Sequence, residues 1–311
     1  MNPFAQLLAL LASTLPLHCT LGEVANALSS VVHITPENFF SIKVPTYSEK
    51  IAEEVKDLTI VAESKGVFIT TDYTSNELPD NSLAYHAVKG MVMAESRWYF
   101  SSMQLEKDML SADNNPQINA HFLHVNSGGG EAWYLDQLAN TLASLKKPIY
   151  TYSEKVMASA AYYIGVHGSV IKTRTQNDTI GSIGTILDGW DIISYFEKMG
   201  LTRLRATATN SDLKNKMYED FRKGEDKQVI EEVLDPFQNL FANTVRSARP
   251  ILNYDDTHPI FRAETFLGNK AVENKLIDGV CTIEQALSEA NQLGLGWKST
   301  NSIKQQLSQI L

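Results

Sequence analysis

The 311-residue chain is 43% hydrophobic and 20% charged, which is typical of a globular protein and not of a disordered one. Its formal net charge of −9 argues against nucleic acid as the main partner, because binding to phosphates needs a basic face. Cys19 and Cys281 are too far apart in sequence to suggest a CxxC metal pair or a disulfide framework, so we expect two free thiols in a reducing compartment.

The first 83 residues carry the weakest patterns and are predicted to form an N-terminal extension of helices and short strands. An amphipathic helix is predicted near the start, because apolar residues recur there on one helical face: Phe4, Leu7, Leu8, Leu11 and Leu15. A cleaved signal peptide is disfavoured, because no Lys or Arg precedes Lys43. No run of about 18 apolar residues is present, so we expect no membrane span and a cytoplasmic location.

Further elements of this extension follow from local composition. Helices are predicted at Leu21–Val32 and Tyr47–Ala62, and short strands at Ile42–Pro45 and Gly66–Thr71. A polar loop at residues 74–82 then marks the predicted boundary between the extension (1–83) and the main domain (84–311).

From residue 84 onward, strand and helix patterns alternate, which predicts a layered α/β fold. The predicted strands are 87–93, 118–125, 148–152, 170–173 and 204–207, and a glycine-marked segment follows the fourth of them at 179–186. The predicted helices are 99–110, 131–145, 159 onward, 192–199, 226–249 with a kink near Pro236, 264–274 and 283–293. Residues 210–224 are polar and are predicted to be irregular, and the pair Lys146-Lys147 is predicted to be a solvated turn.

Two stretches of the main domain together favour an acyl-transfer site. His124–Gly130 (HVNSGGG) is typical of a strand that ends in a glycine-rich turn and opens a helix. Met157–Tyr163 (MASAAYY) places Ser159 among alanines at the start of another helix. Bare backbone N–H groups and a serine at a helix N-terminus are the parts that such a site uses. Both patterns also arise for structural reasons alone, as turn geometry and as a serine N-cap.

A nucleophilic serine needs a base, and the residues alone leave its identity open. His124 is the most suggestive of the seven histidines, although a structural role in its strand is the simpler interpretation. Lys214 and Lys216 are the lysine candidates, since burial in an apolar site lowers the pKa of a lysine enough for it to accept a proton.

The region from about Ala87 to Ala286 resembles the signal peptide peptidase A (protease IV) family, including its relatives among phage head maturation proteases. Five segments occur in the family's order: Asn126–Gly130, with Gly128 where proline is usual; Lys147–Tyr150; Met157–Tyr163; Thr179–Ile186; and Phe266–Ala271 followed by Leu276–Asp278. Each segment alone is a weak signal, but their order and spacing together are specific.

The resemblance implies a Clp-protease/crotonase-like fold, a layered β-β-α superhelix, and a serine endopeptidase with a Ser-Lys dyad. Ser159 aligns with the nucleophile. Lys214 aligns with the base, within Asn210–Asn215, which keeps neither the glycine nor the aspartate of the family pattern Ser-Gly-x-x-Lys-Asp; Lys216 is the second choice. The implied oxyanion hole consists of the backbone N–H groups of Gly129 and Ala160.

The resemblance also implies partners and substrates. Gly128 and Gly130 would lie beside an extended peptide or protein substrate that pairs through its main chain. No metal or organic cofactor is implied. We expect a homo-oligomer, because the first helix and helix 226–249 have apolar faces. Without a convincing membrane anchor, a cytoplasmic or phage-type protease that cleaves capsid or scaffold protein is favoured.

Three other functions remain possible at this stage. A crotonase-like acyl-CoA enzyme would use the same backbone N–H groups but would need neither Ser159 nor Lys214. An inactive scaffold that assembles as a ring or shell would explain the departures at Gly128 and around Lys214. A Clp-like Ser-His-Asp protease is disfavoured, because only His167 lies between Ser159 and His258.

Overall fold

The computed structural model describes residues 45–189 and 191–308. The chain divides into two compact units, residues 1–51 and residues 52–311. Several predictions lie outside the described residues: the amphipathic N-terminal helix, helix 21–32, Cys19, and all of strand 42–45 except its last residue. The predicted helix 47–62 is confirmed as α3 (Tyr47–Glu63).

The boundary between the units differs from the one predicted at residue 83. Residues 52–83 belong with the main unit because β1 (Ile69–Thr70) pairs in parallel with the start of β2 (Ser82–Met93). Tyr73 adds to this attachment, since its hydroxyl donates to the Tyr85 carbonyl at 2.6 Å. The segment is therefore an edge of the central sheet.

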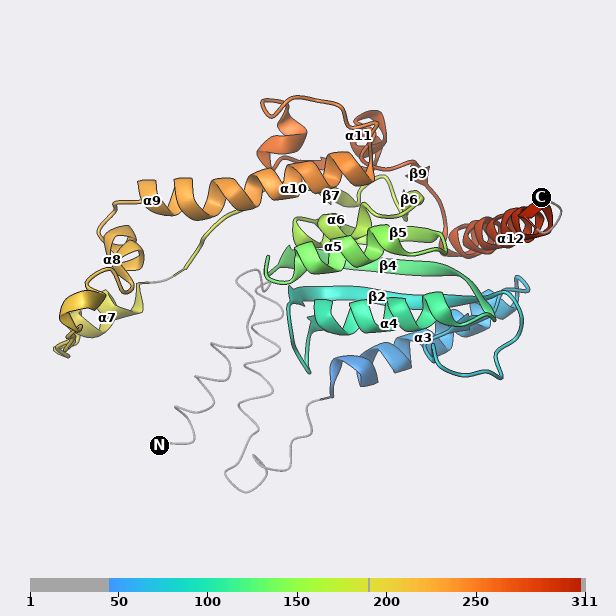
Figure 1. Cartoon of the computed structure of the whole chain (residues 1–311), viewed down its shortest axis with the longest axis horizontal. Helices are drawn as coiled ribbons and strands as arrows, with labels where there is room; N and C mark the ends of the chain where they lie inside the picture. The colour runs from blue at the N-terminus through green and yellow to red at the C-terminus, as the bar shows by residue number, and fades with distance from the viewer. Residues whose placement is uncertain (1–44, 190, 309–311) are drawn as a thin grey trace, which may run out of the picture. The chain divides into compact units, whose positions relative to one another are not determined.

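The centre of the unit is a sheet in the order β1-β2-β4-β5-β6-β9 (Figure 1). It contains β4 (Ile118–Gly130), β5 (Ile149–Ala158), β6 (Val170–Thr173) and β9 (Gly279–Val280), and every pair along this path is parallel. Residues 118–125 of β4 are all buried, as expected for a parallel sheet covered on both faces. The predicted α/β class is confirmed.

Strand β5 changes its partner along its length. Residues 150–153 pair with β6, whereas residues 156–158 pair with β7 (Thr179–Gly181). Lys155 lies between the two halves and has a φ of 66°, a left-handed conformation that breaks the regular course of a strand. This change of partner gives the sheet two parts, as the layered β-β-α superhelix requires, and it sends the end of β5 toward β7.

The sheet is completed by short strands and covered by helices. β3 (Phe100–Ser101) pairs with the end of β2, and β8 (Thr265–Leu267) pairs antiparallel with β7. The helices of this part are α4 (Ser102–Asn114), α5 (Leu135–Ser144), α6 (Ala160–Gly165), α11 (Gly268–Glu273) and α12 (Ile283–Ser308). Residues 264–274, predicted as one helix, are instead β8 and α11, because β7 offers a free edge.

The predicted long helix 226–249 is interrupted near Pro236, as expected. It consists of α9 (Lys227–Val229), a π-helical turn at Ile230–Leu234, and α10 (Asp235–Ala248), in which the proline lies in the first turn. A proline is tolerated there because the N–H groups of a first turn have no acceptor within the helix.

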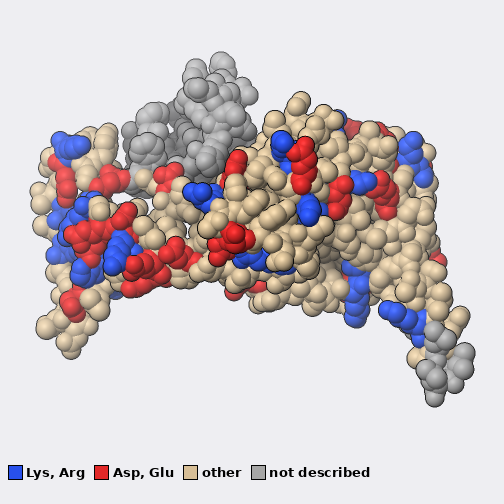
Figure 2. All heavy atoms as spheres, turned by 90° about the horizontal axis from the view of Figure 1, so that it is seen from above, with Lys and Arg blue, Asp and Glu red and all other residues tan. Residues whose placement is uncertain are grey.

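Residues 186–224, which we call the arm, hold α7 (Ile192–Lys198) and α8 (Lys216–Arg222). Two predictions were wrong here: residues 204–207 are extended but pair with no strand among the described residues, and the segment 210–224 contains α8. Glu219 binds both Arg203 and Arg205, at 2.8 and 2.9 Å. These ion pairs connect residues 203–205 to α8 and hold the arm together. Figure 2 shows basic and acidic side chains intermixed along the surface of the described residues.

Lys147 was also predicted wrongly, since it is buried rather than solvated. Its Nζ donates to the carbonyl oxygens of Ala112 and Asn115, at 2.7 and 2.5 Å. Because these carbonyls lie at the end of α4 and just beyond it, Lys147 satisfies acceptors that the helix leaves open. Lys146, beside it, is exposed as predicted.

Several histidines are buried beside or within the sheet. His86 and His121 lie on β2 and β4 and share a hydrogen bond of 3.1 Å between their rings. Burial lowers the pKa of His86 well below its ordinary value of 6.5, and burial lowers the pKa of His167 to about 4. The folded protein therefore keeps both rings neutral at pH values where the unfolded chain protonates them.

This difference predicts a loss of stability in mild acid. Because the folded-state pKa values are depressed, the unfolded chain binds more protons below pH 6.5, and the free energy of unfolding falls as the pH drops. Between about pH 7.5 and 5.5, each such histidine should cost about 1.4 kcal/mol. Urea unfolding at both pH values should show a smaller loss, by about that amount, in His167→Gln than in wild type. An identical loss in the two proteins would contradict the neutral state of His167.

Candidate active site

Ser159 lies at the junction between β5 and α6, half-buried, immediately before the first helical residue. Its backbone has φ 52° and ψ −129°, a conformation that residues other than glycine rarely adopt and that costs about 1–3 kcal/mol. A serine on a sharp, strained turn from strand to helix is the arrangement of a nucleophile elbow, which exposes the hydroxyl at the end of a sheet.

Hydrogen bonds hold this conformation on both sides of Ser159. Its N–H donates to the Gly181 carbonyl at 2.9 Å, and its carbonyl accepts from the Tyr163 N–H at 3.0 Å. Its side chain caps no N–H of the helix, so the predicted alternative, a serine N-cap, is not what the structure has. The serine is therefore positioned by its backbone, and its hydroxyl has no partner among the described residues.

The glycine-rich segment differs from its predicted form. Gly128, Gly129 and Gly130 remain in β4, where Gly129 pairs with Met91 and Gly130 with Val92, and α5 begins only at Leu135. The strand is longer than predicted because β2 continues beside it. A Cβ on Gly130 would lie 2.0 Å from the Val92 oxygen, so the close approach of the two strands requires a glycine.

Gly129 packs directly against the serine. It has φ 106°, and a Cβ built on it would lie 2.7 Å from the Ser159 Cβ and 3.0 Å from the Ala160 nitrogen. The two residues predicted as an oxyanion hole are thus brought together. Ala160 is the first residue of α6, so its N–H has no acceptor within the helix.

The Gly129 N–H has a neighbour that the sequence did not single out. It donates to the Ser127 hydroxyl oxygen at 3.1 Å, and Ser127 is buried, opposite Met157 of β5. Gly128, in contrast, is exposed, and nothing lies within 4 Å of a Cβ built on it. Gly128 therefore faces open space beside the serine, as a substrate-binding position would.

The structure does not bring either candidate lysine to Ser159. Lys214 is exposed in the turn before α8, where its carbonyl accepts from Arg205. Lys216 forms an ion pair with Asp220, which raises the pKa of this lysine, the opposite of what a base needs. Figure 1 shows α7 and α8 beyond the free end of α9 and apart from α6.

His124, the most suggestive of the histidines in the sequence, is held in structural contacts. His124 is buried, its Nδ1 is 2.9 Å from the Tyr85 hydroxyl, and its Nε2 is 3.6 Å from Glu154. Burial lowers the pKa of His124. The structural interpretation of this histidine therefore holds.

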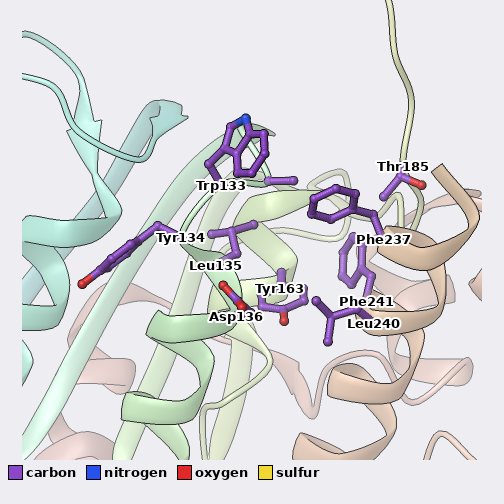
Figure 3. A pocket seen from close by; sticks show the side chains of 10 residues that line it. Trp133, Tyr134, Leu135, Asp136, Tyr163, Thr185, Phe237, Leu240 and Phe241 are labelled. Carbon is purple, nitrogen blue, oxygen red and sulfur yellow. The ribbon is translucent and has the colours of Figure 1, made fainter. Parts of the chain in front are cut away.

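A hollow that we call the aromatic pocket (Figure 3) is lined by Tyr163, which lies one helical turn beyond Ser159; the serine itself is not part of its wall. It has about 600 Å³ of empty space, part of it open to solvent. Its walls come from the segment after β4, from α6, and from α10. The side chains that define it are Trp133, Leu135, Asp136, Tyr163, Phe237 and Phe241.

Residues 45–189 and 191–308 hold no cluster of three or more His, Cys, Asp or Glu side chains that could bind a metal ion. They also hold no helix of the length and apolarity needed to span a membrane. Cys281 is a buried free thiol.

A parallel α/β fold with a strained serine beside a glycine strand is the framework of a hydrolase that acts on acyl groups. Residues 141–295 match the model of Peptidase family S49. The chain is 28% identical over 261 residues to "Putative signal peptide peptidase SppA" of Enterococcus faecium, covering 79% of this chain and 75% of that protein. These two matches confirm the resemblance to the signal peptide peptidase A (protease IV) family that the sequence indicated.

Two solved structures are also similar, both of the 1510-N membrane-bound stomatin-specific protease and both at 15% identity. One is a serine-to-alanine mutant, with a TM-score of 0.42 over 67% of this chain and 84% of that chain. The other is a lysine-to-alanine mutant in complex with a substrate peptide, with a TM-score of 0.43 over 68% and 81%.

The contact between Gly129 and Ser159 predicts unequal effects of alanine at neighbouring glycines. Gly129→Ala should lower the free energy of unfolding by about 2 kcal/mol or more, because the new Cβ meets backbone and a strained residue. Gly128→Ala should cost less than about 1 kcal/mol, since its Cβ enters open space. Urea unfolding of both variants tests this, and equal losses would contradict the packing.

Proposed function

We propose that this chain is a serine endopeptidase in which Ser159 attacks the carbonyl carbon of a peptide bond. The observation that carries the proposal is the backbone of Ser159, which is held at φ 52° with Gly129 and the first N–H of α6 beside it. Strain at a non-glycine residue persists only where the surrounding structure maintains it, and such positions concentrate at active sites. The match to a peptidase family supplies the reaction class.

The oxyanion hole in this proposal consists of the N–H groups of Gly129 and Ala160. As Ser159 Oγ bonds to the carbonyl carbon, the carbonyl oxygen gains negative charge, which two N–H donors stabilise. The Gly129 N–H is bonded to Ser127 in the free protein, so the oxyanion would take over or share this donor. Loss of one such donor typically slows a reaction about 10²–10³-fold.

Lys214 is the proposed general base, and it can act only where its amine is neutral. It would take the proton from Ser159 Oγ and later give it to the leaving amine, after which water hydrolyses the acyl-enzyme. An exposed lysine stays protonated near neutral pH, whereas burial in an apolar site lowers its pKa. The free chain leaves Lys214 exposed, so the active state must cover it.

The arm gives a physical reason for such covering. Its apolar side chains are unusually exposed, including Leu204 at 91%, Ile186 at 82% and Leu213 at 72%. Several large apolar side chains exposed on one short segment are typical of a surface that another protein covers. The proposal is that the protein is a homo-oligomer in which the arm of one copy brings Lys214 to the Ser159 of another copy.

Peptides or proteins are the proposed substrates. An extended substrate strand would lie beside Gly128 and Gly130 and pair through its main chain, which binds without regard to side chains. The Enterococcus faecium relative is named a putative signal peptide peptidase, and short extended peptides fit this mode of binding. The two alternative functions, an acyl-CoA enzyme and an inactive scaffold, require no reactivity at Ser159.

Three substitutions test the proposed dyad. Ser159→Ala and Lys214→Ala should each abolish cleavage of unfolded peptide substrates, by at least about 10³-fold, because nucleophile and base act as a unit. Lys216→Ala should retain most activity, since its side chain already pairs with Asp220. Assays by liquid chromatography would detect the products. Full activity of Ser159→Ala would refute the nucleophile, and loss only in Lys216→Ala would transfer the base role.

A mixing experiment tests whether the site forms between copies. Ser159→Ala and Lys214→Ala chains, inactive alone, should recover about a quarter of wild-type activity when unfolded together and reassembled, because random pairing rejoins an intact Ser159 with an intact Lys214. Light scattering on the same samples measures the assembly. Inactive mixtures that assemble normally would show that both residues must come from one copy.

A further inference from the structure

We propose that the aromatic pocket beside Ser159 binds a positively charged side chain, lysine or arginine, of the peptide that is cleaved. This inference rests on the proposed peptidase function, because it assigns a substrate preference to the same site. It concerns one position of the substrate, close to the bond that Ser159 attacks.

The location of the pocket makes it a substrate site. Tyr163 forms part of its wall, and the Tyr163 N–H donates to the Ser159 carbonyl at 3.0 Å. Trp133 and Asp136 follow the glycine strand by only a few residues. One turn of helix rises about 5.4 Å, so the pocket wall at Tyr163 is within reach of a substrate residue near the bond that Ser159 attacks.

Aromatic rings supply most of the wall. Trp133 and Phe237 form an edge-to-face pair with centroids 6.1 Å apart, and Tyr163 and Phe241 form another at 5.0 Å. Figure 3 shows these four side chains around the hollow, contributed by three separate segments. Aromatic faces attract cations as well as apolar groups, and grouped rings are a known means of binding ammonium and guanidinium groups.

Asp136 distinguishes a cation from an apolar occupant. Asp136 lines the pocket and is exposed to solvent, and among the described residues its carboxylate takes part in no hydrogen bond or ion pair. Its charge contributes, after burial, to raising the pKa of Tyr163, which indicates that the carboxylate lies near this wall. Asp136 is also in the first turn of α5, where a carboxylate is favourable, but that position does not require it to line a pocket.

The two features together match the shape of a basic side chain. The aliphatic stem of lysine or arginine packs against aromatic rings, and its charged end group binds to an anion. A purely apolar side chain packed over the exposed Asp136 carboxylate would displace the water around that charge and offer it no partner, which is unfavourable. A basic side chain can pack against the rings and form an ion pair with the Asp136 carboxylate at the same time.

The test compares peptides that differ only in one charge. Otherwise identical peptides carry lysine or norleucine, in turn, at each position on either side of the scissile bond. At one position, wild type should cleave the lysine peptide about tenfold more efficiently in kcat/KM, and Asp136→Asn should abolish this difference. Phe237→Leu should reduce it. Asp57→Asn, an exposed carboxylate on α3, is the matched control and should keep it.

Binding to Ser159→Ala separates this inference from the proposed function. Calorimetric titration with the same peptides should show tighter binding of the lysine peptide than of the norleucine peptide, and no difference in Ser159→Ala/Asp136→Asn. If wild type cleaves nothing but this binding difference remains, the catalytic proposal fails and the pocket assignment stands. Equal use of lysine and norleucine, or a preference for phenylalanine that Asp136→Asn does not change, would overturn the assignment.

Discussion

The site depends on one constraint, the close approach of the strand that carries Gly129 to the turn that carries Ser159. A side chain at position 129 would lie 2.7 Å from the Ser159 Cβ, so this approach exists only because residue 129 is glycine. The Gly181 carbonyl holds the other side of the turn. These contacts maintain a backbone conformation that an isolated chain would avoid, and the rest of the parallel sheet holds the strands in the positions that make the contacts possible.

The second requirement of the proposed chemistry, a neutral base, is met by nothing that the described part of the free chain places at the serine. The arm that carries Lys214 is held by its own charges, with Glu219 between Arg203 and Arg205, while its leucines remain exposed. An enzyme built this way would be inactive until assembly covers the arm. Assembly would then control proteolysis, since a separate copy would have a positioned serine without a base.

Much of the fold could be predicted from the sequence, because alternating apolar runs and helical periodicity report burial directly. The strand at 170–173 and the serine at a helix start were identified correctly. The glycine segment was not identified as strand, because glycine has low strand propensity and only the neighbouring β2 reveals that it is paired. Lys147 was misjudged for a similar reason, since its two carbonyl partners are distant in sequence.

The sequence likewise predicted one part of the candidate site and not the other. The proximity of Ser159, Gly129 and Ala160 follows from consecutive elements of a parallel sheet, and a family resemblance was enough to pick them out. The role of Ser127 toward the Gly129 N–H and the aromatic pocket could not be read from sequence. The pocket combines residues from separate strands and helices. Serine and aromatic side chains are also common in purely structural positions, so their presence in the sequence does not mark a site.

The most direct test of the account is covalent labelling of the serine. Intact protein would be treated with a fluorophosphonate and analysed by peptide mass spectrometry, with Lys214→Ala in parallel. The account predicts one adduct, on Ser159 of the assembled protein, and none in the variant. Folded and assembled wild-type protein that forms no adduct would contradict an activated serine, and the chain would then be better described as a scaffold of the peptidase fold.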